Sequence, residues 1–137
     1  MATSHEAYVD TSALIAFMDG SDSQHAIFAR LFSDPPRLCT SPLVIAEGHG
    51  WFLRRFDGTR ALEFLALVDA LTPLVVVPVG PKEMAAAALL LRRFADQALT
   101  LADAVGLHLA RARKCKTCWS TDRHLRLAGT PLVIDRI

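Results

Sequence analysis

Long apolar runs are missing from this 137-residue chain, although 52% of its residues are hydrophobic. Pro73, Pro78, Gly80 and Pro81 interrupt the richest stretch, so no run reaches the roughly 18 to 20 apolar residues of a membrane-spanning helix. We therefore expect no membrane association. The first six residues also lack the basic and apolar regions of a signal peptide, which favours a cytoplasmic protein.

Cysteine is scarce, and the three present are Cys39, Cys115 and Cys118. Cys115 and Cys118 form one Cys-x-x-Cys motif, but a structural zinc site normally needs a second ligand pair, which the sequence lacks. A redox pair is disfavoured because Cys118 falls within an expected strand and not at the exposed start of a helix. We therefore expect ordinary buried thiols.

Internal repeats, low-complexity segments and linkers are also absent from the sequence. A chain of this length buries enough surface for one domain with a single hydrophobic core. We expect a short tail over residues 1–6 and one domain over residues 7–137.

Net charge is small, at +1, but it is unevenly distributed. Residues 1–81 carry 5 basic and 9 acidic groups, whereas residues 82–137 carry 10 basic and 5 acidic groups. Many of the basic groups lie close in sequence to Asp122, namely Arg111, Arg113, Lys114, Lys116, Arg123 and Arg126. This pattern predicts a cationic rim that binds a polyanion such as RNA. Residues 111–116 are also typical of a helix end, where cations interact favourably with the helix dipole.

Short apolar segments alternate with longer helical patterns along the chain. The expected strands are Ala7–Val9, Arg37–Thr40, Val75–Val79, Thr117–Thr121 and Leu132–Ile134. The expected helices are Ser12–Met18, Ser23–Phe32, Pro42–Phe56, Thr59–Leu71, Pro81–Phe94, Leu101–Arg113 and Arg123–Leu127. This alternation predicts an α/β fold with a parallel sheet of about five buried strands, covered by helices on both faces.

Acidic residues stand at the ends of several of these elements. Asp10 and Asp122 each follow an expected strand, and ligands of open α/β sheets bind at the carboxyl edge, where neighbouring strands would bring them together. Asp103 follows Thr100 with the spacing of a capping box. Helix capping is an alternative role for all three, and Asp103 could cap and still offer an oxygen to a metal.

Glu47 has no such capping role, because Ser41 and Pro42 already supply the start of its helix. An ionised carboxylate on a buried apolar face is unfavourable unless it is paired or bound to a cation. Arg54 lies two turns later and would have to fold back to reach it. An exposed Glu47 is the remaining alternative.

Converging carboxylates repel one another, by roughly 4 kcal/mol for a pair about 4 Å apart at an effective dielectric near 20. Such a cluster therefore needs a cation or several protons, and carboxylate oxygens favour Mg²⁺ or Mn²⁺. Zinc is disfavoured because the five histidines show no ligand spacing with a cysteine pair, although His49 and His124 lie near the acids in sequence.

Four segments follow one another in a characteristic order along the chain: Tyr8–Leu14, Ser41–Glu47, Leu99–Ala104 and Ser120–Asp122. Together they resemble the PIN-domain ribonucleases, and the short single-domain form is similar to VapC-type toxins of toxin-antitoxin pairs. The resemblance implies Mg²⁺- or Mn²⁺-dependent RNA cleavage by an acidic quartet of Asp10, Glu47, Asp103 and Asp122. It implies that the three aspartates anchor the cation and that Glu47 binds a second ion or positions water. It further implies a cognate antitoxin, and auxiliary groups at Thr11, Ser12, Asp96 and Thr121.

Other interpretations remain open. Asp96 also fits a solvated turn, and the aromatic pair Trp51 and Phe52 fits either RNA bases or the core. Small and apolar residues of the 62–70 and 85–91 helices fit a core or a homodimer interface. Gly48 and Gly50 are unusual inside a helix and predict close packing or a bend.

The alternative function is a PIN-like module that binds RNA or protein without cleavage. A phosphoryl-transfer domain with Asp10 as nucleophile is disfavoured, because Ser12 stands where a haloacid-dehalogenase-like domain usually has a second Asp.

Overall fold

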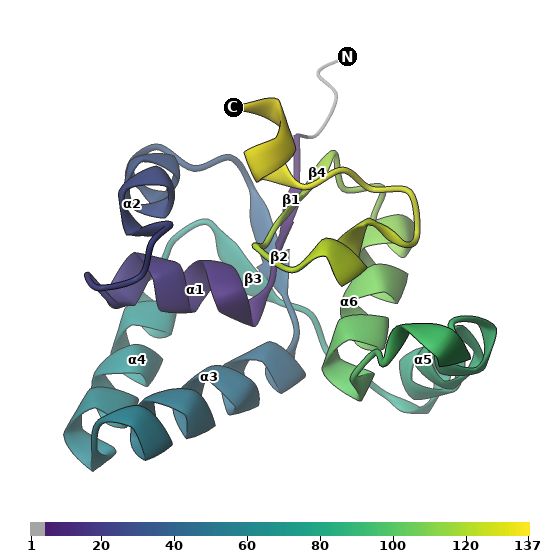
Figure 1. Cartoon of the computed structure of the whole chain (residues 1–137), viewed down its shortest axis with the longest axis horizontal. Coiled ribbons are helices and arrows are strands. Elements are labelled where there is room, and N and C mark those ends of the chain that lie inside the picture. The colour runs from purple at the N-terminus through teal and green to yellow at the C-terminus, as the bar shows by residue number, and fades with distance from the viewer. Residues whose placement is uncertain (1–4) are drawn as a thin grey trace.

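The computed structural model describes residues 5–137 and shows a parallel sheet between two groups of helices (Figure 1). The four strands are β1 (Ala7–Val9), β2 (Leu38–Thr40), β3 (Leu74–Val76) and β4 (Thr117–Trp119). The α-helices are α1 (Thr11–Met18), α2 (His25–Ser33), α3 (Pro42–Arg55), α4 (Gly58–Ala70), α5 (Pro81–Arg93) and α6 (Leu101–Ala112). Short 3₁₀ helices are η1 (Ala95–Gln97), η2 (Arg123–Arg126) and η3 (Val133–Arg136).

The strand order is β3-β2-β1-β4, with every neighbouring pair parallel. Tyr8 of β1 aligns with Cys39 on one side and Cys118 on the other. In Figure 1, α1 to α4 lie on one side of the sheet and α5 and α6 on the other. The predicted α/β class with helices on both faces is therefore confirmed.

The predicted fifth strand is wrong. Leu132 forms a single parallel bridge with Cys118, and the chain then turns into η3. The backbone N–H of Asp135 donates to the carbonyl of Leu132, and the Asp135 carboxylate binds the guanidinium of Arg126 through two hydrogen bonds. These contacts hold the segment in a turn, so an apolar sequence alone was not sufficient for a strand. The segment 123–127, predicted to be helical, forms the 3₁₀ turn η2.

The prediction that all strands are buried holds for β1 and β2 but not for β3. β3 is an edge strand, and Val75 and Val76 are exposed. β3 also ends earlier than the predicted segment 75–79. The backbone N–H of Val77 makes one further hydrogen bond, to the carbonyl of Thr40, and the chain then leaves the sheet.

Two glycines allow close approaches that position the helices. A Cβ atom built at Gly48 of α3 would lie 2.1 Å from Cζ of Phe64 in α4, so the predicted close packing occurs there. A Cβ atom at Gly106 of α6 would lie 2.8 Å from Cε2 of Tyr8 in β1. Gly106 is one turn after Asp103, so this contact brings the start of α6 close to the end of β1.

Residues 1–4 of the predicted tail lie outside the part of the chain that the structure describes. Within that tail, Glu6 is buried and its carbonyl accepts a hydrogen bond from the backbone N–H of Lys116. The ordered domain thus already includes Glu6.

Candidate metal centre

The two strand-end aspartates lie at the same edge of the sheet, because β1 and β4 are neighbours. Val9 aligns with Trp119, and the backbone N–H of Asp10 continues the ladder by donating to the carbonyl of Trp119. Asp122 follows Trp119 by three residues. The two strands are therefore neighbours, which is what Asp10 and Asp122 need in order to lie close together.

Four acidic side chains line one cleft of about 340 Å³ at this edge. α1, α3, α6 and the segment after β4 each supply part of its wall. Asp10 and Asp103 are buried, Asp122 is half-buried and Glu47 is exposed. The full lining consists of Asp10, Thr11, Ser12, Ile15, Glu47, Trp51, Arg54, Thr100, Asp103 and Asp122.

Asp10 is held by hydroxyl groups and does not cap α1. It occupies the N-cap position but makes no side-chain capping hydrogen bond. Its Oδ2 atom accepts hydrogen bonds of 2.8 Å from both Ser12 and Ser120. Burial raises the pKa of Asp10 to about 6, and the nearby Asp103 contributes in the same direction, while the two serines oppose the change. A buried anion beside other carboxylates is a favourable position for a cation.

Asp103 and Asp122 do cap, as the alternative interpretation predicted. Asp103 and Thr100 form a reciprocal capping box, with both hydrogen bonds 3.1 Å long. Asp122 accepts 2.9 Å from the backbone N–H of His124, whose Nδ1 lies 3.1 Å from the same oxygen. Asp103, Asp122 and His124 can also each offer one ligand atom to a metal, and these atoms lie within 4.8 Å of one another. Capping thus fixes the carboxylates without excluding a ligand role.

The prediction that Glu47 lies on a buried apolar face of its helix is wrong. The buried face of α3 consists of Val44, Gly48 and Phe52, whereas Glu47 is exposed on the side that faces the cleft. Desolvation therefore does not explain this residue. Its Oε1 atom accepts a 2.8 Å hydrogen bond from the Thr11 hydroxyl, which orients the carboxylate.

The auxiliary residues are only partly as predicted. Thr121 is exposed and donates its backbone N–H to Ser12, whereas the buried Ser120 donates to Asp10 and accepts from the backbone N–H of Asp122. Alternation beyond β4 could have revealed this, since residues 120 and 122 share a side in extended chain. Asp96 lies in η1, is exposed and is not part of the cleft lining.

Most of the predicted cationic rim lies away from the cleft. Arg113, Lys114 and Lys116 come just before β4, at the amino ends of the strands, while the acids occupy the carboxyl ends. Arg111 is in the last turn of α6, far along the helix from Asp103. Arg126 is engaged by Asp135. Arg123, which directly follows Asp122, is exposed and is the predicted basic residue nearest to the site in sequence.

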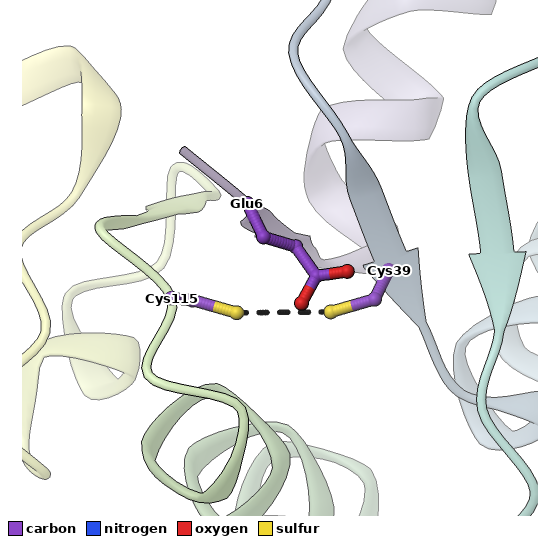
Figure 2. A group of neighbouring side chains, drawn as sticks. All are labelled: Glu6, Cys39 and Cys115. Atoms are coloured by element: carbon purple, nitrogen blue, oxygen red, sulfur yellow. Dashed lines mark hydrogen bonds between the residues drawn. The ribbon is translucent and has the colours of Figure 1, made fainter. Parts of the chain in front are cut away.

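A second group of possible ligand atoms lies at the opposite end of β1. Figure 2 shows the Glu6 carboxylate pointing toward the sulfur atoms of Cys39 and Cys115, which are 3.7 Å apart. Both oxygens of Glu6 accept hydrogen bonds from Arg113, at 3.0 and 2.9 Å. The contact with Cys115 and burial both raise the pKa of the Cys39 thiol. The guanidinium neutralises the carboxylate and the Cys39 thiol stays protonated, so this group is a packed core cluster.

This cluster makes a stability prediction. Glu6→Gln should lower the free energy of unfolding by roughly 2 to 4 kcal/mol, because it leaves the partly buried Arg113 without its anion. Asp135→Asn is the matched control, since it breaks a more exposed bidentate pair with Arg126 and should cost clearly less stability. Urea unfolding of the two variants measures the difference. Equal losses would show that burial of Glu6 adds nothing to the pair.

The residues of the cleft fit a divalent cation. The donor set consists of carboxylate oxygens, which suit Mg²⁺ and Mn²⁺. Two of the acids are buried, and among the described residues no Lys or Arg forms an ion pair with Asp10, Asp103 or Glu47. His124, which is half-buried, adds one nitrogen donor.

The structure thus defines a small α/β domain with clustered carboxylates at the carboxyl edge of its parallel sheet. The PIN domain family model matches residues 7–130, and the chain belongs to this family. Among curated proteins, it is 29% identical over 125 residues to ribonuclease VapC26 of Mycobacterium tuberculosis, covering 90% of this chain and 92% of that one.

Solved structures of VapC proteins share the fold. The chain superimposes on Mycobacterium tuberculosis VapC20, a toxin that cleaves the sarcin-ricin loop, with a TM-score of 0.82, 24% identity and coverage of 90% of this chain and 95% of that one. Rickettsia felis VapBC2, solved with a DNA fragment from its promoter, gives a TM-score of 0.65 at 12% identity, with 93% and 96% coverage. The predicted resemblance to VapC-type PIN domains is confirmed.

Over residues 5–137, the structure contains no helix that is both long enough and apolar enough to span a membrane.

Proposed function

We propose that this protein is a Mg²⁺- or Mn²⁺-dependent endoribonuclease and the toxin component of a toxin-antitoxin pair, located in the cytoplasm. The observation that carries the proposal is the cleft in which Asp10, Glu47, Asp103 and Asp122 converge from four separate segments. Its relatives support the RNA substrate, because one is a curated ribonuclease and another cleaves the sarcin-ricin loop.

Each acid has a distinct place in the proposed mechanism. Asp10, Asp103 and Asp122 would hold the cation, which supplies Lewis-acid stabilisation of the charge that develops on the phosphate. Glu47 is the most exposed of the four and is fixed through one oxygen by Thr11, so its other oxygen can accept a proton from the attacking water. The water oxygen bonds to phosphorus, the phosphorus–oxygen ester bond breaks, and the leaving oxygen takes up a proton.

Two serines prepare the site before the substrate arrives. Ser12 and Ser120 lie 3.1 Å apart, and both donate to the same oxygen of Asp10. This arrangement leaves Oδ1 of Asp10 available for the cation and fixes the plane of the carboxylate. Such fixed orientation lowers the reorganisation needed during reaction.

The antitoxin and the homodimer are part of the same proposal. Structural neighbours include a toxin-antitoxin complex from Klebsiella pneumoniae and VapBC2 from Rickettsia felis. Leu62 of α4 and Leu89 of α5 are 65% and 64% exposed, so each of these two helices offers apolar surface to a protein partner.

The proposal is tested by incubating the purified protein with total RNA in Mg²⁺, in Mn²⁺ and in EDTA. We expect cleavage that EDTA abolishes and that Glu47→Gln reduces at least a hundredfold with folding intact. Glu63→Gln, an exposed change on α4 outside the acidic cleft, should cleave like the wild type. Undiminished cleavage by Glu47→Gln would exclude the assignment. RNA binding without cleavage in either metal would favour the catalytically silent module.

A further inference from the structure

The predicted cationic rim lies largely away from the acidic cleft, yet a polyanion must approach four carboxylates. A single divalent cation offsets only part of their charge. Among the described residues, Arg54 is the one basic side chain in the cleft lining. The cleft therefore has its own cation, from an element that the charge pattern of the sequence did not indicate.

Arg54 reaches the cleft by folding back along α3. A Cβ atom built at Gly50 would lie only 2.9 Å from Nη1 of Arg54, so the guanidinium lies directly across the glycine. Any larger residue at position 50 would displace it. Within residues 5–137, Arg54 makes no ion pair, in contrast to Arg60, Arg113 and Arg126. Its charge is thus available to a ligand.

Trp51 lies between Glu47 and Arg54 on the same face of α3. Residues four and seven positions apart share a helix face, and all three side chains line the cleft. The Trp51 indole is half-buried and packs edge-on against Phe52, with ring centroids 4.9 Å apart, which restricts its motion. Phe52 itself is fully buried, so the sequence-based alternative of stacking on Phe52 is wrong.

Resting on the nuclease function proposed above, we propose that Trp51 and Arg54 bind the nucleotide next to the scissile phosphate of single-stranded RNA. The indole stacks on the base, and the guanidinium forms hydrogen bonds with a phosphate oxygen. α3 then presents a carboxylate, an aromatic ring and a cation in order, leading away from the metal site. Such a subsite binds unstacked bases with little sequence preference.

Tryptophan fluorescence tests the binding step without requiring cleavage. The chain has two tryptophans, and Trp119 is 2% exposed, so quenching by RNA reports mainly on Trp51. With a random single-stranded 12-mer in Ca²⁺, which takes the same oxygen ligands, we expect saturable quenching in the wild type and its loss in Trp51→Phe. Unquenched wild-type fluorescence at RNA concentrations that saturate binding would overturn the proposal.

Steady-state kinetics test the role of each side chain. Arg54→Ala should raise KM roughly tenfold with kcat changed less than about twofold, and should lower the salt dependence of binding by about one phosphate contact. Arg54→Lys should recover part of the loss, because it keeps the charge but not the planar fork. Trp51→Ala should raise KM roughly 5- to 100-fold, and Trp51→Phe, which keeps an aromatic face, much less.

Arg92→Ala is the matched control. Arg92 carries the same charge and is exposed in the last turn of α5, outside the cleft lining, so the KM of this variant should stay within about twofold of the wild type. An equal effect of Arg92→Ala, or a fall in kcat at unchanged KM for Arg54→Ala, would overturn the subsite. Variants at Trp51 and Arg54 that bind RNA normally but no longer bind an antitoxin would also overturn it, in favour of a protein-binding face. Quenching without cleavage would retain the subsite and reject the nuclease.

Discussion

An Asp10→Asn variant should lose metal-dependent RNA cleavage by about a thousandfold or more and, in EDTA, should be more stable than the wild type. Asparagine can still accept the hydroxyl hydrogen bonds of Ser12 and Ser120, but it removes the charge of a buried group. The pKa of Asp10 is raised from 3.8 to about 6, which corresponds to an unfavourable contribution of roughly 1 to 3 kcal/mol at neutral pH.

The gain in stability should depend on pH with a defined sign. The folded protein holds the proton on Asp10 up to about pH 6, whereas the unfolded chain releases it near 3.8. The destabilisation is therefore complete above pH 6, decreases as the pH falls below that value, and vanishes below about 3.8. Urea unfolding in EDTA at pH 7.5 and pH 4 should show the advantage of Asp10→Asn at the higher pH and little at the lower.

Asp96→Asn is the matched control, because Asp96 is exposed in η1 and outside the cleft. It should leave both cleavage and stability close to those of the wild type. Saturating Mg²⁺ should reverse the ranking, since the cation stabilises the wild-type carboxylate and not the amide. If Asp10→Asn were less stable than the wild type in EDTA at pH 7.5, the buried charge would not be the unfavourable feature that we infer.

Gly48→Ala should destabilise the protein by about 2 to 3 kcal/mol or more, although alanine normally favours a helix. The new Cβ atom would lie 2.1 Å from Cζ of Phe64, which is fully buried. Phe64 stacks on Phe52 with ring centroids 5.4 Å apart, so the ring cannot move aside without disturbing the α3–α4 contact. Overpacking of this kind forces side-chain and backbone shifts. Chemical denaturation measures the loss.

Gly50→Ala provides the comparison on the same helix. Its Cβ atom would meet Nη1 of Arg54, the flexible end of a side chain that can shift. We therefore expect the free energy of unfolding to rise by about 0.5 to 1 kcal/mol. A Phe64→Leu change should partly relieve Gly48→Ala, giving a double variant more stable than the sum of the single effects predicts. Additive losses would show that Phe64 is not what requires glycine at position 48.

The acidic residues illustrate what local patterns can predict. Asp10 and Asp122 could be placed at strand ends because strand and helix signals are short-range, and the parallel sheet then brought them to one edge. Capping by Asp103 followed from its spacing to Thr100 alone. The argument for Glu47 failed because the buried face of α3 depends on where α4 packs, and α4 packs against Gly48.

The basic residues illustrate the opposite case. Closeness in sequence to Asp122 suggested that residues 111–116 surround the site, but β4 separates them from it by the length of a strand. Arg54, far away in sequence, lines the cleft because the missing side chain at Gly50 lets it fold back. Ser120, and not Thr121, supports Asp10, because side chains alternate in extended chain.

Local sequence patterns were sufficient to predict the α/β class, the positions of most helices and strands, and the acidic residues that end them, because hydrophobic period, caps and turn residues act over a few positions. Which strands pair, whether segment 132–134 turns or extends, and which hydroxyl and cationic side chains meet the acids all depend on the assembled fold. Those outcomes depend on contacts such as Ser120 to Asp10, which lie 110 residues apart in sequence and form only when the sheet assembles.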